Sequence, residues 1–204
     1  MRAQAAVVQR ARACGLIDAA PLAAVDATGL ETRHVSAYFG IRRANGAGHR
    51  QRAWPKLTAV IHAHSHLILG AMPGVGPSQD SPDFTPAMRQ AAALTGIDTA
   101  LADAGYDAEH NHRLCREELG VRRTLIRLNP RNTGQRWPKT PHRRAMREHF
   151  DHALYNQRWH AESGFSQHKR RLGSALATRR DEAQSRGLVL RVLTHNLMLL
   201  AEAA

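Results

Sequence analysis

Apolar runs that close in glycine turns recur along the first half of the chain and predict short strands. Residues 1–14, rich in Ala and Arg, predict a helix that Gly15 ends. The apolar stretch from Pro21 to Val25 leads into DATGL, which is typical of a strand closing in a glycine turn. LTAVIHA and LILGAMPG, joined around Ser65, then predict a β-hairpin.

Helices and strands alternate after the hairpin. Residues 82–93 predict a helix, because Pro and Asp stand at its start and a helical pattern follows. ALADAGYD is a second apolar strand that closes in a glycine turn, and a helix over about 108–119 comes next, with Gly120 as its stop. RRTLIRLN predicts a further strand, which ends in a loop of Pro, Asn and Gly at 129–134.

The last third of the chain is predicted to be mostly helical. Thr140 and Pro141 are typical of the N-cap and first turn of a helix. We expect breaks near Gly173 and Gly187, where glycine would interrupt the helical pattern. The final apolar segment, residues 187–200, contains Arg, His and Asn, so it fits a packed terminal helix and not a membrane span.

The order of these elements predicts an α/β fold built on a mixed sheet. A strand–helix–strand step implies a parallel crossover, whereas a hairpin implies an antiparallel pair. A chain of 204 residues has room for one ordinary domain with a core of its own. We therefore expect an N-terminal helical segment over 1–20 and one α/β domain over 21–204.

The charge of the chain favours a polyanionic partner. Twenty-nine Lys and Arg against seventeen Asp and Glu leave a net charge of +12, and Arg greatly outnumbers Lys. A GC-rich genome would explain Arg over Lys but not the net excess, so nucleic acid is the favoured partner. Residues 31–55 predict an irregular, exposed basic segment. The candidate phosphate contacts from this segment and its end are Arg42, Arg43, Arg50, Arg52 and Lys56.

Other composition features are compatible with a cytoplasmic protein. Cys14 and Cys115 are too few for a zinc site and are expected to be reduced thiols.

The alternation of His62, His64 and His66 is compatible with zinc on one face of a strand, but these histidines straddle the hairpin turn, so metal ligation is the less favoured interpretation. A second basic group, Arg122, Arg123 and Arg127, offers further phosphate contacts, although a solvated charge is the favoured interpretation of each one alone.

Two aspartates stand at the ends of predicted strands, where a lone charge would be costly to bury. Asp26 follows Val25 in DATGL, and Asp103 follows the apolar run of ALADAGYD. A single aspartate of this kind is usually a turn-capping residue, but two matching cases favour a site at the edge of the sheet. Asp107 is an alternative to Asp103, although it is better placed as the N-cap of the next helix. Asp80 and Asp83 are assigned to helix capping.

A third acid lies on a predicted helix. Tyr155, Arg158, Glu162 and Lys169 would share a stripe roughly 60° wide on one helix face, at about 100° per residue. The competing interpretation is a solvated face with an Arg158–Glu162 ion pair, which would contribute only about 0.2–0.5 kcal/mol. Gly164 argues against a strong helix here, because glycine weakens a helix interior.

These motifs together resemble the DDE transposases of bacterial insertion sequences, in the group marked by a Tyr-x2-Arg-x3-Glu-x6-Lys signature. Tyr155, Arg158, Glu162 and Lys169 match every fixed position of that signature. DATGL is similar to the segment of the first acid and LADAGYDAE to that of the second. The resemblance implies an RNase H-like fold, a five-stranded mixed sheet flanked by helices, with Asp26, Asp103 and Glu162 as catalytic metal ligands.

Three carboxylate ligands in an open site suit Mg²⁺ or Mn²⁺, and two such ions can clamp the attacking and leaving oxygens at a phosphate. The resemblance implies DNA cleavage at the ends of an element and strand transfer into a target. It also implies a homodimer on double-stranded DNA in the bacterial cytoplasm, associated with the nucleoid. Tyr155, Arg158 and Lys169 would hold the DNA backbone, or Arg158 could instead orient Glu162.

Asp26 comes early for such a transposase, which usually carries a larger N-terminal region that recognises the ends of the element. Residues 1–20 are therefore expected to be a remnant of an end-binding region. Three origins stay open: a shortened copy, a misassigned start, and one part of a split gene. Two other functions stay open from the sequence: an inactive DNA-binding remnant of a transposase, and a stand-alone nuclease of the same fold that cuts but does not join.

Overall fold

A five-stranded mixed sheet forms the centre of the molecule, as the element order predicts. The computed structural model describes residues 2–32, 53–130 and 137–203. The strands lie in the order β4-β3-β1-β5-β6, with antiparallel pairs among the first three and parallel pairs among the last three. Their bounds are β1 (Leu22–Gly29), β3 (Trp54–His62), β4 (Ile68–Gly76), β5 (Thr99–Ala102) and β6 (Arg123–Ile126).

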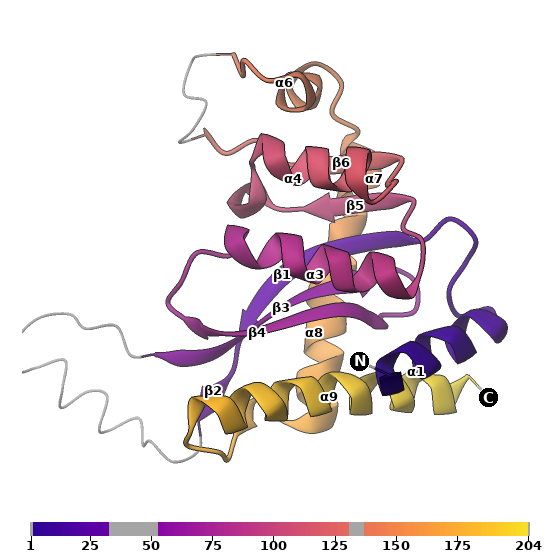
Figure 1. Cartoon of the computed structure of the whole chain (residues 1–204), viewed down its shortest axis with the longest axis vertical. Coiled ribbons are helices and arrows are strands. Elements are labelled where there is room, and N and C mark those ends of the chain that lie inside the picture. Colours follow the sequence, from indigo (N-terminus) through magenta and orange to yellow (C-terminus); the bar gives the residue numbers. More distant parts are fainter. Residues whose placement is uncertain (1, 33–52, 131–136, 204) are drawn as a thin grey trace, which may run out of the picture.

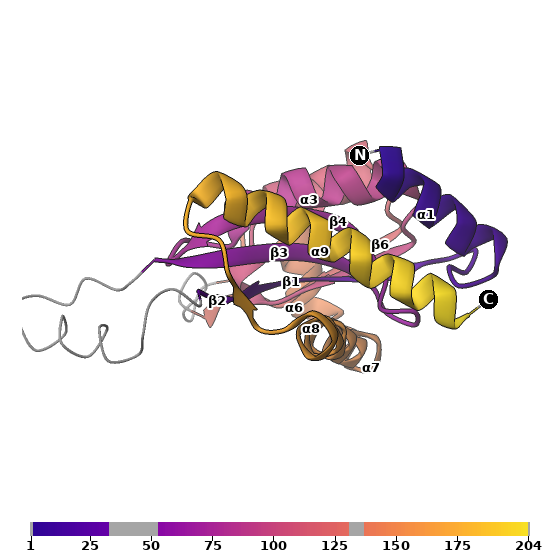
Figure 2. The same ribbon diagram turned by 90° about the horizontal axis from the view of Figure 1, so that it is seen from below.

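Helices cover both faces of this sheet and one of its edges (Figures 1 and 2). Helices α1 and α3 lie on one face, α8 crosses the other, and the long α9 runs along the β4 edge. A two-stranded parallel pair of β2 (Glu31–Thr32) and β7 (Ala175–Leu176) lies apart from the main sheet. The longer helices are α1 (Arg2–Ala13), α3 (Ser81–Leu94), α6 (Pro141–Glu148), α8 (Trp159–Leu172) and α9 (Asp181–Glu202). The short helical elements are η1 (Ala104–Tyr106), α4 (Glu109–Arg113), η2 (Leu114–Glu118), α7 (His152–Tyr155) and η3 (Asn156–Arg158).

The alternation of side chains along β1 divides the interior into two cores. Ala23 and Val25 belong to the core beneath α1 and α3, whereas Leu22 and Ala24 belong to the core beneath α8. A strand that is apolar on both faces is typical of the centre of a sheet covered by helices on both sides. The period of two therefore decides which face each later residue of β1 reaches.

Helix α9 covers the backbone of the edge strand β4. The amide group of Asn196, which is fully buried, accepts a hydrogen bond from Ile68 N at 2.9 Å and donates one to Ile68 O at 2.8 Å. Gln4 of α1 donates a second bond to the same carbonyl at 2.6 Å. An uncovered edge strand would leave these groups exposed for pairing with another chain, so the contact both docks the helix and protects the edge.

Most predicted elements are confirmed, with four differences outside the segment of the signature residues. Residues 31–55 are not wholly irregular, since Glu31–Thr32 form β2 and β3 begins at Trp54; Arg42, Arg43, Arg50 and Arg52 lie outside the described residues. Gly187 does not break the last helix: α9 continues through this position, and the packing of α9 against the rest of the fold stabilises the helix. The helix over 108–119 is divided into α4 and the π-helical η2. Thr140 begins α6 without a side-chain capping bond.

The break at Gly173 and the stops at Gly15 and Gly120 are confirmed. All three glycines have positive φ angles of 70–84°, a conformation that residues with a Cβ rarely adopt.

In the described part of the chain, no helix has the length and apolar character needed to cross a membrane.

Replacing Asn196 by Ala is expected to destabilise the fold by about 1–3 kcal/mol, because it leaves the buried Ile68 N–H without its acceptor. Gln4 would still satisfy the carbonyl, which limits the loss. Urea unfolding followed by circular dichroism measures the change. Leu197→Ala is the matched control on the same helix: its side chain is 47% exposed, so a shift within about 0.5 kcal/mol is expected. Equal losses for both variants would contradict the role of Asn196.

Candidate active site

The first two predicted acids lie side by side because their strands are neighbours in register. Val25 of β1 pairs with Ala102 of β5 in the parallel ladder, and each acid is the next residue along its strand. Neighbouring strands are separated by about 4.8 Å, so the main chains at Asp26 and Asp103 are close. Both residues continue the alternation that places Ala24 and Leu101 in the core beneath α8. The two carboxylates therefore emerge on the same face.

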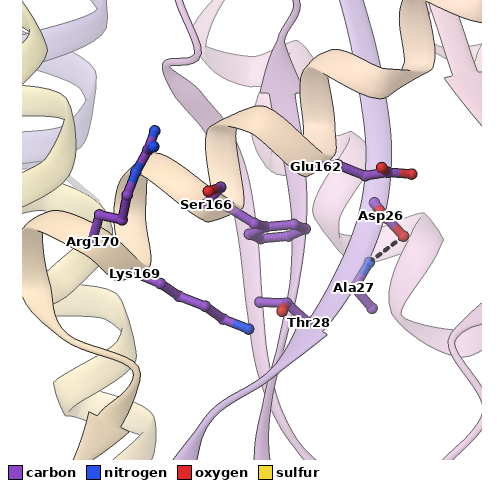
Figure 3. Close-up of a pocket in the computed structure, with 8 residues that line it drawn as sticks. Asp26, Ala27, Thr28, Glu162, Ser166, Lys169 and Arg170 are labelled. Carbon is purple, nitrogen blue, oxygen red and sulfur yellow. Dashed lines mark hydrogen bonds between the residues drawn. The ribbon is translucent and has the colours of Figure 1, made fainter.

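Helix α8 brings the third acid to that face. Ala161 and Phe165 of α8 are buried in the core beneath it, which turns Glu162 toward the end of β1 (Figure 3). Gly164 permits this approach, because a Cβ at that position would lie 3.0 Å from Cγ2 of Ile61 on β3. The glycine that weakens the helix in isolation is thus what lets the helix lie close against the sheet.

Arg158 connects two of the three acids. Its Nη1 lies 3.4 Å from Oδ2 of Asp26, and its Nη2 donates to Oε1 of Glu162 at 2.9 Å. The Arg158–Glu162 pair expected of a solvated helix face does form, but Arg158 is only 22% exposed and is shared with a strand 132 residues away in sequence. The ion pair is therefore part of a site and is not an isolated surface contact.

The predicted continuous helix under the signature residues is wrong in its first half. Tyr155 lies in α7, Arg158 ends the 3₁₀ turn η3, and α8 begins at Trp159. Tyr155 is half buried against Phe150, with ring centroids 4.9 Å apart. The tighter 3₁₀ turn changes the spacing between Tyr155 and Glu162 from that of a straight α-helix.

A cavity of about 480 Å³ opens beside Asp26 and Glu162 (Figure 3). Lys169, the last residue of the signature, lines it and extends toward Thr28 of β1. Three polar lining residues were missed from the sequence: Thr28, Ser166 and Arg170. Ser166 and Arg170 follow Glu162 at intervals of four, so the helical period could have identified them.

Burial governs the electrostatics of Asp26. Removal from water raises the pKa of its carboxyl group, and the charges of Asp103 and Glu162 raise it further. The backbone N–H of Ala27, 2.9 Å from Oδ1, and the Arg158 guanidinium act in the opposite direction.

Asp103 and Asp107 have different surroundings, which bears on the choice between them. Asp103 is half buried and accepts a hydrogen bond from Gly105 N at 2.8 Å. Asp107 forms a bidentate pair with Arg143, at 2.7 and 2.8 Å, and its side chain is fully buried. The prediction that Asp107 caps the next helix is wrong, because the N-cap of α4 is Ala108. Its pairing nevertheless leaves Asp103 as the better candidate ligand.

Lys56 does not fit its predicted role in DNA binding. It is 5% exposed, and its ammonium group lies 3.2 Å from Asp80 and 2.8 Å from Asp83. These two acids were assigned to capping, but Asp80 makes no side-chain cap bond at the start of α3. Through these two ion pairs Lys56 connects β3 to the start of α3, so it is not a candidate DNA contact.

The Arg122, Arg123 and Arg127 group is also divided. Arg122 forms a bidentate pair with Asp98, which precedes β5 and so lies at the end of the strand remote from Asp103. Arg123 pairs with Asp151 at 3.8 Å. Arg127 follows β6 and its N–H bonds to the carbonyl of Ala102, so it alone of the three stands beside the acids.

Comparison with protein families identifies the chain. The model of the transposase DDE domain matches residues 18–197, which is most of the sequence and includes all three acids. The chain belongs to the DDE transposase family. A comparison with curated proteins gives no match. The five-stranded mixed sheet flanked by helices is consistent with the RNase H-like fold expected of a DDE transposase domain.

DDE transposases generally use divalent metal ions, and the residues of this site fit that requirement. Asp26 and Glu162 present carboxylate oxygens to one cavity, and Asp103 stands beside them on the neighbouring strand. Hard oxygen donors of this kind suit Mg²⁺ or Mn²⁺. The charges of Asp103 and Glu162 act on Asp26, and a bound cation would offset them more fully than Arg158 alone.

Replacing Asp26 by Asn tests this electrostatic account in the absence of DNA. Because the pKa of Asp26 is raised by burial, the ionised carboxylate destabilises the metal-free fold once the pH exceeds that pKa. With EDTA present, Asp26→Asn should therefore melt at a higher temperature than wild type at pH 7, and the difference should shrink as the pH falls toward 4. Mg²⁺ should stabilise wild type but not the variant. A wild type that is indifferent to Mg²⁺ would contradict a metal site here.

Proposed function

We propose that this DDE transposase domain cleaves DNA strands at the ends of an insertion sequence and joins them to a target. The observation that carries the proposal is that Arg158 joins Asp26 to Glu162, that these two acids line one cavity, and that Asp103 follows the neighbouring strand. Both reactions are displacements at phosphorus, so a single set of carboxylates can serve them in turn. Asp26, Asp103 and Glu162 are the proposed catalytic residues.

These three carboxylates would hold Mg²⁺ or Mn²⁺, in our proposal two ions, which supply Lewis-acid stabilisation of charge at the phosphate. Glu162, at 63% exposed, has the freedom to adjust its carboxylate as substrate enters. Asp26, at 20% exposed, is fixed by the strand and by Ala27 N. A rigid acid and a mobile one together can follow the change of geometry between cleavage and joining.

Arg158 is proposed as a positioning residue in the free protein. Its two contacts orient Asp26 and Glu162 before DNA is present, which favours the second of the two roles considered from the sequence. Tyr155 lies within reach of Arg158 and is proposed to contact the DNA backbone from the same side. Arg127, at the end of β6, is added as a candidate phosphate contact.

Lys169 is proposed to bind a phosphate on the other side of Glu162. Its ammonium group extends along the cavity toward Thr28 (Figure 3). In sequence Lys169 follows Glu162 on α8, whereas Arg158 precedes it. Cations on both sides of the acids would hold a strand across them, since phosphate contacts fix the register of DNA on a protein. The net charge of +12 supports a DNA partner, and by resemblance we propose that two copies act together on it.

Glu162→Gln is the decisive variant for the catalytic proposal. Purified protein is incubated with Mg²⁺ or Mn²⁺ and labelled duplexes that carry the terminal repeats flanking the gene, and both nicked and joined products are quantified. Loss of one metal-binding carboxylate should lower the cleavage rate at least about 100-fold, because metal stabilisation of the transition state is worth several kcal/mol. The matched control is Glu182→Gln on α9, whose side chain is 89% exposed.

The pattern of products separates this function from its competitors. Nicking and joining that both depend on Glu162 support a transposase. Nicking without joining would indicate a stand-alone nuclease of the same fold. DNA binding that is equal in wild type and Glu162→Gln, with no products from either protein, would indicate an inactive binding remnant and reject the catalytic proposal.

Lys169→Gln tests the phosphate contact independently of catalysis. DNA affinity is measured against salt concentration, and loss of one phosphate contact should reduce the slope of log K against log salt by about 1. Arg186→Gln removes an 81% exposed cation from α9 and should leave the slope unchanged. An unchanged slope for Lys169→Gln would remove Lys169 from the DNA interface.

A further inference from the structure

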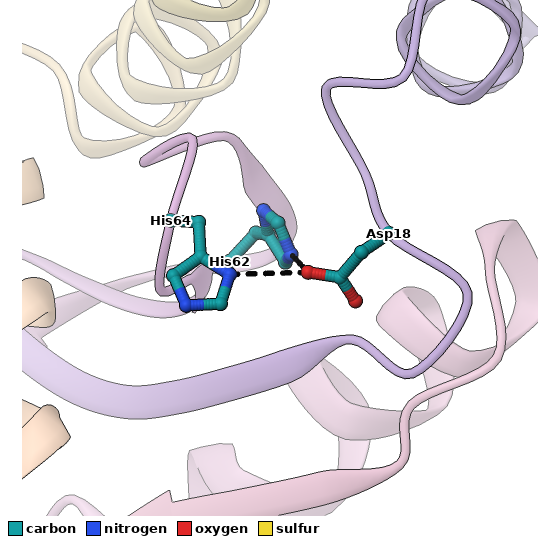
Figure 4. Close-up of side chains that lie close together, drawn as sticks. All are labelled: Asp18, His62 and His64. Carbon is teal, nitrogen blue, oxygen red and sulfur yellow. Dashed lines mark hydrogen bonds and ion pairs between the residues drawn. The ribbon is translucent and has the colours of Figure 1, made fainter.

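A second cluster of metal-binding side chains lies at the opposite end of β1 from the acids. It consists of Asp18, His62 and His64 (Figure 4). His62 is paired with Ala23 near the start of β1, whereas Asp26 is paired with Ala59. Three residues along a strand correspond to roughly 10 Å, so the two clusters are separate.

The turn after β3 explains how His62 and His64 come together. His62 is the last residue of β3, and the turn that follows is closed by hydrogen bonds from His62 N to Leu67 O and from His66 N to His62 O. His66 has a positive φ of 59°, which reverses the chain sharply. The turn folds His64 back beside His62 instead of leaving it to follow the alternation of a straight strand.

The three ligand atoms have spacings close to those of a tetrahedral metal site. Oδ2 of Asp18 lies 3.1 Å from Nδ1 of His64 and 3.5 Å from Nε2 of His62, and all three atoms lie within 4.8 Å of one another. Ligands at about 2.0–2.1 Å from a tetrahedral Zn²⁺ are separated from each other by about 3.3 Å. Two of the three spacings therefore need little change, and the 64% exposed His64 can rotate to adjust the third.

His62 supplies an independent sign of a missing ligand. Its side chain is fully buried, and among the described residues its Nε2 has no hydrogen-bond partner. Nε2 lies 3.5 Å from Oδ2 of Asp18, which is an ion-pair distance when the imidazole is protonated but is too long for a well-formed hydrogen bond (Figure 4). A buried nitrogen without a partner is costly, and a cation between it and the carboxylate would satisfy both.

The other nitrogen of His62 has the partner that a metal ligand requires. Nδ1 lies 2.7 Å from Oγ of Ser65, to which a protonated Nδ1 can donate, and 3.3 Å from the backbone N of Ser65, which donates to Nδ1 in the other tautomer. Metal binding at Nε2 would select the first of these two tautomers. That hydroxyl also accepts from Leu67 N at 3.4 Å. In this tautomer the lone pair of Nε2 points toward Asp18, and metal-bound histidines commonly donate their second N–H in this way.

We propose that Asp18, His62 and His64 bind Zn²⁺, with the fourth position left to water. Two imidazoles and one carboxylate are a donor set that suits Zn²⁺, whereas Mg²⁺ prefers oxygen ligands alone. The metal joins the segment between α1 and β1 to the turn between β3 and β4. It thereby fixes the N-terminal helix against the sheet without entering the proposed catalytic site.

Zinc binding by the purified chain tests the site directly. Stoichiometry and affinity are measured by competition with a chromogenic chelator, in millimolar Mg²⁺ so that the carboxylate cluster is occupied. Wild type should bind one Zn²⁺ and melt at a higher temperature with it. His64→Ala and Asp18→Asn should each weaken binding by at least about 100-fold, which exceeds the usual loss from removing a supporting residue.

His149→Ala is the matched control, because His149 is an 82% exposed histidine remote from the cluster. It should bind Zn²⁺ as wild type does. No binding by wild type, or equal binding by all four proteins, would overturn the proposal. His64 and Asp18 are both partly exposed, and circular dichroism verifies that their variants fold. If His64→Ala loses its fold, His64→Gln repeats the measurement with a polar side chain in place.

Discussion

The cost of holding carboxylates close together at the end of a buried strand governs the arrangement around Asp26. Burial and the neighbouring acids both raise its pKa, so the metal-free protein has to supply compensating charge. Arg158 does so from the 3₁₀ turn before α8, and the approach of α8 itself depends on the bare backbone at Gly164. The sheet fixes two of the acids, whereas helix packing fixes the third and its counter-charge. Loss of the helix packing, or of Arg158 itself, would leave the charge of Asp26 without this compensation.

The fold was largely predictable from local signals because those signals agreed with one another. Apolar runs ending in glycine turns predicted β1 and β5, and two apolar runs joined around Ser65 predicted β3 and β4. The errors arose where tertiary packing outweighed local preference. Gly187 lies inside α9 because the helix is held by its contacts with β4 and with the core beneath α8. A glycine penalty of about 1 kcal/mol is small beside the burial of such a face.

The candidate site was predictable in its acids but less so in its cations. Asp26, Asp103 and Glu162 could be selected because an acid after an apolar strand, or in a fixed signature, is unusual. Lys56 could not be judged from sequence, since its partners lie 24 and 27 positions away on α3 and its turn. The same holds for Asp18, whose contact with His64 spans 46 positions and joins segments that no local pattern relates.

The attachment of α6 depends more on charged contacts than that of the other long helices. No residue of α6 is buried, and its start is held by Asp107, which pairs with Arg143, and by Glu109, which accepts from the N–H groups of His142 and Arg143. Asp107 lies only four residues after Asp103. Charge contacts weaken in salt, whereas the apolar cores do not. Mechanically, α6 is joined to the loop of the second acid by ion pairs and to the core beneath α8 by the partly buried Met146, so a displacement of this helix is transmitted to that loop as well as to the core.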